Sequence, residues 1–307
     1  MNDASAEKKP AKERRVITAP ERSNRLDQAM NVRRTGAQIH PLTDAYYFIM
    51  RASWPRTLLL IFTVFSAINL IYAAAYTLVG GIENARPGNF EDAFFFSVQT
   101  LATIGYGKMA PASRMTNFLV MLEAFSGILA TTITTGLLFA KFSRPTSRVL
   151  FSNVMLVSAR DGIPTLQFRM ANARGNQIMQ AAVQVVFSYL HVTAEGENLR
   201  RLVPLKLTRS ESALFALSWT AFHHVDEASP LFGRDAAWLK KNDAGFIVSL
   251  VGLDETLGQT VHARHSWDAD CVVFGGRFVD VMTTHADGTR ELNLDKLHDY
   301  VLDEPVA

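Results

Sequence analysis

The stretch that decides the fold is residues 90–107, FEDAFFFSVQTLATIGYG. Residues 90–102 are typical of a helix, because Glu91 and Asp92 fall in its first turn, where the helix dipole favours acids. Such a helix reaches about 20 Å, which is shorter than a membrane span. The glycine-bearing segment 103–107 that follows it is expected to be irregular backbone, which is tolerated at membrane depth only where protein or water shelters it.

Two apolar runs flank this stretch. Residues 57–82 contain no charged side chain, and residues 115–140 contain only Glu123. Each run is long enough to cross a bilayer, for which roughly 20 residues suffice. The sequence therefore predicts an outer helix over 56–82, a pore helix over 90–102 and an inner helix over 114–142. Cations gather at the outer helix's N-terminal end and the inner helix's C-terminal end, which predicts that both chain termini are cytoplasmic.

The segments before the first span are of two kinds. Residues 1–36 carry an excess of basic side chains and few large apolar ones, so we expect a disordered basic tail and no signal peptide. Residues 41–53 have apolar side chains on one helical face, which predicts a short interfacial helix. A transmembrane pore domain is thus expected over 37–145.

The rest of the chain, 146–307, alternates in the period of half-buried strands separated by turn signals, which predicts a β-sandwich. It contains no GxGxxG, HExxH, CxxC or GxSxG motif, so we expect no enzyme activity and no cofactor. The formal charge of the 307 residues is +2, and we expect no nucleic-acid partner. The single cysteine, Cys271, excludes an intrachain disulfide and is expected to fill core space.

The composition of residues 103–107, TIGYG, indicates a specific chemistry. A dehydrated K⁺ ion needs oxygen ligands in place of water, and rings of backbone carbonyls from four converging chains supply them. Gly105 and Gly107 permit the alternating backbone that aims these carbonyls inward. Thr103 adds a hydroxyl ring, and Tyr106 is expected to turn outward and brace the strand against the pore helix. The expected K⁺ ligands are Thr103, Ile104, Gly105 and Tyr106, in a homotetramer.

At this point the sequence resembles a known family, the inward-rectifier potassium channels, and especially their bacterial members. The resemblance begins with FEDAFFFSVQTLATIGYGKMAP and continues through KFSRPTSRVLFS (141–152), SWTAFHHVDEASPLFG (218–233) and HARHSW (262–267). It implies a tetrameric K⁺-selective channel in a prokaryotic plasma membrane, with an immunoglobulin-like cytoplasmic domain over 146–307. The alternatives are a poorly selective cation channel and a non-conducting, membrane-anchored β-sandwich sensor.

The resemblance also points to gating positions on the inner helix. Phe139 lies where the family places a bulky gate residue, with Leu138 as the second candidate. Gly127 and Gly136 are candidate hinges because glycine weakens a helix, although close helix packing explains a glycine equally well.

Several positions depart from the family pattern. Gln99 replaces a pore-helix acid, and Glu123 is expected to buttress the filter instead, with Lys108 as a partner. Thr131 lies at a cavity position, and Gln180 at a cytoplasmic position, where strong rectifiers carry acids. Glu255 matches a second cytoplasmic acid and is retained. We therefore expect weak rectification, with Mg²⁺, polyamines and Ba²⁺ as blockers.

Basic residues gather at the expected membrane–cytoplasm junction, where each gains ~1 kcal/mol beside an anionic surface. The family is regulated by anionic phospholipids such as phosphoinositides, so these residues are a candidate lipid site, although they also fit a role in setting topology alone. They are Arg51, Arg56, Lys141, Arg144 and Arg148.

Overall fold

The structure is a computed structural model that describes residues 16–20 and 41–303. It divides into two compact units, which we call the helical unit and the β unit. The helical unit is Thr35–Arg144, and the β unit is Met1–Arg34 together with Pro145–Ala307.

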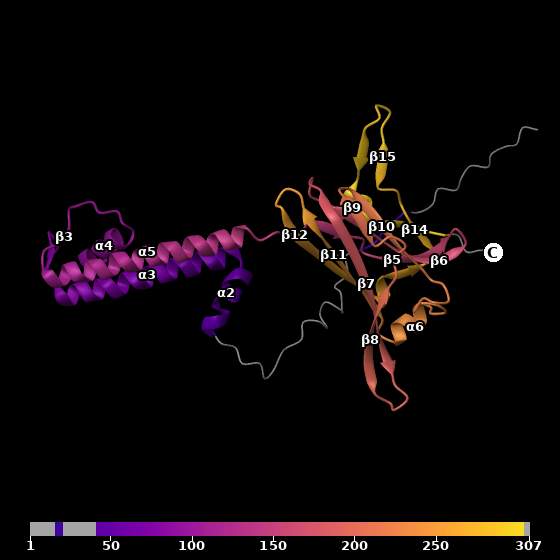
Figure 1. The fold of residues 1–307 in the computed structure, drawn as a ribbon, viewed down its shortest axis with the longest axis horizontal. Helices are drawn as coiled ribbons and strands as arrows, with labels where there is room; N and C mark the ends of the chain where they lie inside the picture. Colours follow the sequence, from indigo (N-terminus) through magenta and orange to yellow (C-terminus); the bar gives the residue numbers. More distant parts are fainter. Residues whose placement is uncertain (1–15, 21–40, 304–307) are drawn as a thin grey trace, which may run out of the picture. The chain divides into compact units, whose positions relative to one another are not determined.

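The described part of the helical unit consists of one short, one half-length and two long helices, with a small ribbon (Figure 1). Figure 1 shows the long helices α3 and α5 alongside each other, with α4 packed beside one end of the pair. The elements are α2 (Pro41–Arg51), α3 (Trp54–Val79), β2 (Ile82–Glu83), α4 (Phe90–Leu101), β3 (Ala110–Pro111) and α5 (Arg114–Phe142).

Helix bounds follow local signals. Pro55 occupies the first turn of α3, where its missing N–H costs nothing. Gly80 and Gly81, both with positive φ, end that helix, three residues earlier than the sequence predicts. A Cβ on Gly81 would lie 2.8 Å from the Ser113 Oγ, so glycine allows the end of α3 to approach the start of α5 closely. There, Ser113 caps α5 by accepting the Thr116 N–H at 3.1 Å.

Both long helices are apolar enough to cross a membrane, but only 11 % of the most apolar window of each is buried within the chain. Large side chains such as Phe62 and Phe125 are more than 60 % exposed. In a soluble protein such helices would be mostly buried. The exposed faces therefore fit lipid and further copies of the chain.

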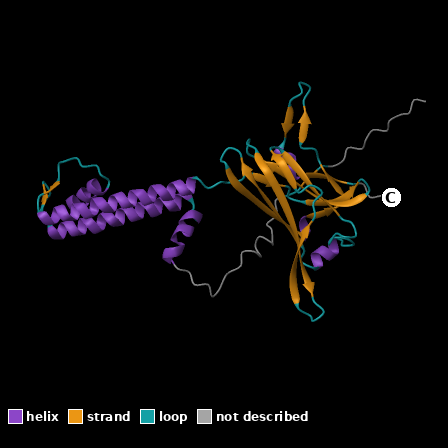
Figure 2. Cartoon of the chain, in the orientation of Figure 1, coloured by secondary structure: helices purple, strands orange, loops and turns teal. Residues whose placement is uncertain are grey.

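The β unit contains two five-stranded sheets (Figure 2). The first has the order β10-β6-β5-β13, with β4 also on β6, and all its pairings are antiparallel except β5 with β13. The second has the order β12-β11-β7-β8, with β9 also on β7, and is antiparallel throughout. The first sheet comprises β4 (Val149–Phe151), β5 (Met155–Arg160), β6 (Ile163–Asn172), β10 (Ser218–His224) and β13 (Val272–Phe274). The second comprises β7 (Ile178–Val192), β8 (Asn198–Leu205), β9 (Glu211–Phe215), β11 (Gly245–Asp254) and β12 (Gln259–Asp268).

The inner faces of these two sheets share one apolar core. Phe168 of the first sheet packs with Phe187, Phe246 and Trp267 of the second, and all four are 1 % exposed or less. The Trp267 Nε1–H donates to the Ser152 carbonyl at 2.7 Å, so the largest core side chain has no unpaired donor. The predicted β-sandwich is therefore confirmed. The expectation that Cys271 fills core space also agrees with its burial.

Smaller elements complete the β unit. They are the strands β14 (Gly276–Phe278), β15 (Met282–Thr284), β16 (Arg290–Leu292) and β17 (Asp299–Leu302), the helix α6 (Ala236–Lys241) and the 3₁₀ turns η1 (Ala269–Cys271) and η2 (Leu294–His298).

One segment of the expected N-terminal tail is ordered. Ile17–Thr18 forms strand β1, which pairs antiparallel with β17 and extends a third sheet of order β1-β17-β14. Ala19 is buried, and its carbonyl accepts the Asn153 Nδ2–H at 2.8 Å. The prediction of disorder over 1–36 is thus wrong for residues 16–20, because Val16, Ile17 and Thr18 are strong strand formers inside a polar segment. Residues 1–15 and 21–36 lie outside the described residues.

Candidate functional site

The segment 103–107 begins where the pore helix α4 ends. Its first amides turn back onto that helix: Thr103 N donates to the Thr100 carbonyl at 3.1 Å, and Ile104 N donates to the Gln99 carbonyl at 2.8 Å. Gly105 N reaches the same Gln99 carbonyl at 3.4 Å. These bonds use carbonyls that the last turn of a helix leaves free, so the helix end holds the start of the loop in place.

The backbone of this segment alternates in handedness. Thr103, Gly105 and Gly107 have φ values of 57°, 58° and 77°, whereas neither Ile104 nor Tyr106 has a positive φ. Such alternation turns successive carbonyls toward one side, as a row of ion ligands requires. Two of the three left-handed positions are the glycines picked out by the sequence. The third, Thr103, has no signal in the sequence, because a β-branched residue rarely adopts a positive φ outside strained functional sites.

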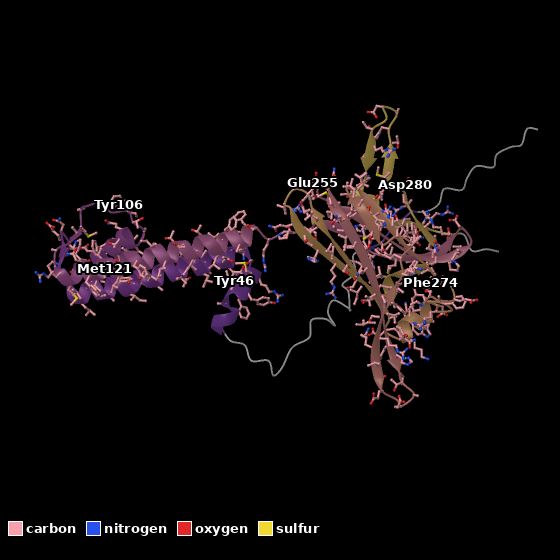
Figure 3. All side chains as sticks on the ribbon, in the orientation of Figure 1. Tyr46, Tyr106, Met121, Glu255, Phe274 and Asp280 are labelled. Atoms are coloured by element: carbon pink, nitrogen blue, oxygen red, sulfur yellow. The ribbon has the colours of Figure 1, made fainter. Side chains whose placement is uncertain are left out.

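The side chains of the segment are open to the surroundings of a single chain. Tyr106 is 75 % exposed and Ile104 is 47 % exposed. Figure 3 places Tyr106 on the loop at the edge of the helical unit. The expectation that Tyr106 braces against the pore helix is therefore not met within one chain. The exposure of Ile104 and Tyr106 leaves this segment open on the side away from the pore helix of the same chain.

Glu123 lies fully buried where α3, α4 and α5 meet. The Tyr76 O–H donates to its Oε2 at 2.6 Å, and its Oε1 contacts the Ser97 hydroxyl. The expected partner Lys108 is instead exposed, and no hydrogen bond or ion pair joins it to Glu123 among the described residues. Buttressing through Lys108 is thus not seen within one chain and stays a prediction. Gln99 acts on residues 103–107 through its backbone carbonyl.

The two inner-helix glycines differ. A Cβ on Gly127 would lie 2.5 Å from the Leu101 carbonyl oxygen, so glycine there permits close packing of α5 on the end of α4. Gly136 has no atom within 4 Å of its hypothetical Cβ. Packing therefore explains Gly127, and Gly136 remains the candidate hinge.

The gate and cavity candidates lie in the C-terminal half of α5. Phe139 is 73 % exposed and Leu138 is half-buried. Thr131 is exposed and lines a groove of about 750 Å³ between α3 and α5, together with apolar side chains of both helices.

The basic residues at the junction divide into two groups. Lys141 is 8 % exposed, and its Nζ donates to the carbonyls of Ile49 at 2.9 Å and Ala52 at 2.7 Å. Arg144 donates to the Met50 carbonyl at 3.0 Å. These carbonyls lie in the last turn of α2 and, for Ala52, directly after it, where the helix dipole favours cations. The last turn of α5 thus holds the interfacial helix, a role that the charge pattern did not reveal.

The other cations stay open to solvent or lipid. Arg51, Arg56 and Arg148 are exposed. The two residues that precede Arg148 are fixed within the β unit: Arg174 donates to the Thr146 carbonyl at 2.8 Å, and the Ser147 hydroxyl donates to the His262 carbonyl at 2.6 Å.

The expected blocker-binding acid, Glu255, and the neighbouring candidate Gln180 lie on the β-sandwich. Glu255, which Figure 3 labels, is exposed in the turn between β11 and β12. Gln180 is also exposed, with a φ of 50°, at a bulge where the β7–β11 register shifts. Bulges re-aim side chains, so this irregularity presents the Gln180 side chain outward.

The β unit also holds a buried histidine. His223 is 5 % exposed, with Nδ1 2.8 Å from the Lys206 carbonyl and Nε2 2.7 Å from the Ser229 hydroxyl. Burial lowers the pKa of His223. The described residues contain no cluster of histidine, cysteine and acids that could hold a metal ion.

Two apolar spans around a half-length helix, with an alternating glycine-bearing segment at its end, define a pore-loop ion channel. Comparison with protein families agrees: the model described as "Ion channel" matches residues 57–144, and the model described as "Inward rectifier potassium channel C-terminal domain" matches residues 149–305. The chain belongs to the inward-rectifier potassium channel family.

Individual relatives support this assignment. The chain is 43 % identical to the inward rectifier potassium channel Kirbac3.1 of Paramagnetospirillum magnetotacticum, over 95 % of this chain and 97 % of the relative. It is 29 % identical to the mouse G protein-activated inward rectifier potassium channel 3, over 89 % of this chain and 74 % of the relative. These relatives are ion channels and not enzymes. Among solved structures, Spo0M of Bacillus subtilis matches with a TM-score of only 0.24 over 45 % of this chain and 59 % of that one.

Proposed function

We propose that four copies of this chain form a K⁺-selective pore in which Thr103, Ile104, Gly105 and Tyr106 bind the permeant ion. The observation that carries this proposal is the alternation of positive φ at residues 103, 105 and 107 at the end of a half-length helix. Such a backbone lets carbonyls line one side of a strand, and four strands around an axis replace the water around K⁺. K⁺ is cargo here, and conduction needs no catalytic residue or cofactor.

The test is K⁺ flux into liposomes that contain the purified full chain, with Ba²⁺ as blocker. Gly105→Ala places a side chain at a φ of 58° within the segment and should abolish flux. Gly288→Ala makes the same change at a φ of 84° in the β15–β16 turn and should leave flux intact. Undiminished flux in Gly105→Ala would reject residues 103–107 as the pore, and absence of Ba²⁺-sensitive flux in the wild type would favour the non-conducting sensor.

Selectivity is tested separately. Carbonyl ligation predicts that the reversal potential in mixed K⁺ and Na⁺ follows the K⁺ gradient. A reversal potential near zero under opposed gradients would instead support a poorly selective cation pore.

We place the gate at Phe139, because four exposed phenyl rings at the cytoplasmic end of α5 would close a pore by excluding water. Phe139→Ala should raise the open probability in single-channel recordings. Phe118→Ala removes another exposed phenyl ring, near the N-terminal end of α5, and serves as the control.

Lipid modulation is proposed for the exposed cations Arg51 and Arg56, because Lys141 and Arg144 already hold carbonyls of α2. Flux should depend on the fraction of anionic lipid in the liposome, and Arg51→Gln with Arg56→Gln should weaken that dependence. Arg290→Gln, which removes an exposed cation from the β15–β16 hairpin, is the matched control.

Rectification is proposed to be weak. Thr131 and Gln180 are uncharged, so of the three positions that the family uses to hold blockers only Glu255 carries an acid. Mg²⁺ and polyamines applied from the cytoplasmic side should block the wild type shallowly, and Thr131→Asp should make the block steeper. A steep block of the wild type would contradict this reading.

A further inference from the structure

A buried polar chain crosses the interior of the helical unit. It runs from the Tyr76 hydroxyl to Glu123, on to the Ser97 hydroxyl and the Asn69 side chain, and ends at the Phe65 carbonyl. Tyr76 is 1 % exposed, and Asn69, Ser97 and Glu123 are each 0 % exposed. The chain joins α3, α4 and α5, so all three helices meet at one carboxyl group.

The protons of this chain can be counted. It has four contacts, and each hydrogen bond needs its own proton. The Tyr76 and Ser97 hydroxyls supply one each. Asn69 takes part in two of the four contacts, one through Nδ2 and one through Oδ1, so its amide supplies one more proton. With an ionised Glu123, three protons thus serve four contacts, and two acceptor oxygens face each other in a buried site, which is costly.

A proton on Glu123 completes the chain. Tyr76 then donates to Oε2 at 2.6 Å, and Oε1–H donates to the Ser97 oxygen. The Ser97 hydroxyl donates to the Asn69 Oδ1 at 3.1 Å, and the Asn69 Nδ2–H donates to the Phe65 carbonyl at 2.8 Å. Turning the Asn69 amide over does not replace this proton, because Oδ1 would then face the Phe65 carbonyl.

The surroundings supply no charge that would hold an ionised carboxylate. Among the described residues, no salt bridge reaches Glu123. The titratable groups nearby are Tyr76 and Tyr72 of α3, and the Tyr72 hydroxyl contacts the Ser126 hydroxyl at 2.9 Å. The acids of α4 lie at its other end, where Arg86 binds Asp92 at 2.8 Å.

We propose that Glu123 is a neutral carboxylic acid that donates to Ser97 and positions the pore helix for conduction. This inference rests on the proposed K⁺ pore. Ser97 lies two residues before Gln99, whose carbonyl binds the amides of Ile104 and Gly105. Gly127, one turn after Glu123, packs against the Leu101 carbonyl. One face of α5 therefore contacts α4 at two points, Glu123 with Ser97 and Gly127 with Leu101. The contact between Glu123 and Ser97 needs a donor on Glu123.

The experiment compares Glu123→Gln with Glu123→Ala in the full-length protein in liposomes. Glutamine carries an N–H₂ for Ser97 and an oxygen for Tyr76, so it mimics the neutral acid. We expect Glu123→Gln to retain K⁺ flux and K⁺/Na⁺ selectivity within about twofold, and Glu123→Ala to lose at least about tenfold in flux. If both variants lose flux equally, the neutral acid is rejected.

A second readout does not depend on conduction. At neutral pH the wild type should show the infrared carbonyl band of a neutral carboxylic acid, and Glu123→Gln should lack it. Tyr76→Phe should shift this band, because it removes the donor to Oε2, whereas Tyr72→Phe, one turn away, should leave it unchanged.

The two readouts separate the two proposals. A wild type that carries the band but conducts no K⁺ would reject the pore function and the positioning role, and would retain the neutral acid. A conducting wild type without the band would reject the neutral acid and retain the pore.

Discussion

The β unit and the helical unit close their interiors in different ways. The β unit buries large aromatic side chains between two sheets of its own chain, as with Phe168 against Trp267. The helical unit buries one small apolar cluster and one polar chain, and leaves most of both spans exposed. The β unit is thus largely complete within one chain, whereas the exposed apolar faces of the helical unit fit lipid and neighbouring copies of the chain. A change inside the β unit should lower stability, and a change inside the helical unit should mainly alter conduction.

The largest effect on conduction is expected where the helical unit is packed most closely. Gly127→Ala places a Cβ 2.5 Å from the Leu101 carbonyl oxygen, which forces the end of the pore helix away from α5. A displacement of this kind should reduce K⁺ flux at least about 100-fold, since a misplacement near 1 Å is enough to disable a positioned site. Liposome flux measures this.

Gly136→Ala is the control for that measurement. It adds the same methyl group to the same helix, at a position where no atom lies within 4 Å of the new Cβ. It should keep the pore intact and at most change the open probability. Equal damage from both alanines would show that glycine acts through helix flexibility and not through packing.

In the β unit, Trp267→Ala should cost about 3–5 kcal/mol, because it removes a fully buried indole and leaves the Ser152 carbonyl without its donor. Native-state hydrogen exchange of the amides of β7 and β11 in the full chain measures this loss. Leu202→Ala, at a position 62 % exposed on β8, should change the exchange little. A large loss of K⁺ flux without a change in exchange would contradict the comparison.

The third largest effect is expected at the hydrogen bonds by which Lys141 of α5 holds α2. Lys141→Met keeps the length of the side chain but removes donors to the Ile49 and Ala52 carbonyls. It should weaken the attachment of α2 by about 2–3 kcal/mol, as expected for hydrogen bonds from a charged group. Faster hydrogen exchange of α2 amides is the measurement, and Arg56→Met, at an exposed cation, is the control. Unchanged exchange in Lys141→Met would return Lys141 to the lipid-site interpretation.

Some of these features are visible in the sequence and others depend on tertiary contact. The two spans and the role of Gly105 could be predicted, because few structures other than a pore loop place a glycine-bearing segment between two apolar runs of membrane-spanning length. The positive φ of Thr103 could not, since nothing local favours it. The partners of Glu123 come from other helices, and periodicity does not reveal them. Lys141 was assigned to lipid because a cation at a membrane edge and a cation at a helix end look alike in sequence.

The β-sandwich was predicted from alternation, but the strand at Ile17–Thr18 was missed. Five residues within a polar segment do not change its average composition. Their order depends on pairing with Asp299 and Tyr300 near the other end of the chain. Short edge strands of this kind are decided by partners far away in sequence.

The smallest effect distinguishes two buried titratable groups, His223 of the β unit and Glu123 of the helical unit. A neutral His223 can donate from Nδ1 to the Lys206 carbonyl and accept at Nε2 from the Ser229 hydroxyl. Both ring nitrogens are then hydrogen-bonded without an added proton. Burial lowers the pKa of His223, ahead of the opposing effects of Lys206 and Asp226. Below about pH 6.5 an unfolded histidine takes up a proton that the folded one resists, so the unfolded state binds more protons and stability falls as pH falls.

Hydrogen exchange of β10 in the full chain should therefore accelerate between about pH 7 and about pH 5.5, after correction for the intrinsic pH dependence of exchange. His223→Gln should flatten that change. Acid adds no proton to Glu123 if it is already neutral, so the amides of α4 should keep their protection over the same range. Matched acceleration in α4 and β10 would mean that both interiors respond to one global opening. The proposed difference between the two interiors, a β-sandwich that acid destabilises and a helical interior that already holds its proton on Glu123, would then be wrong.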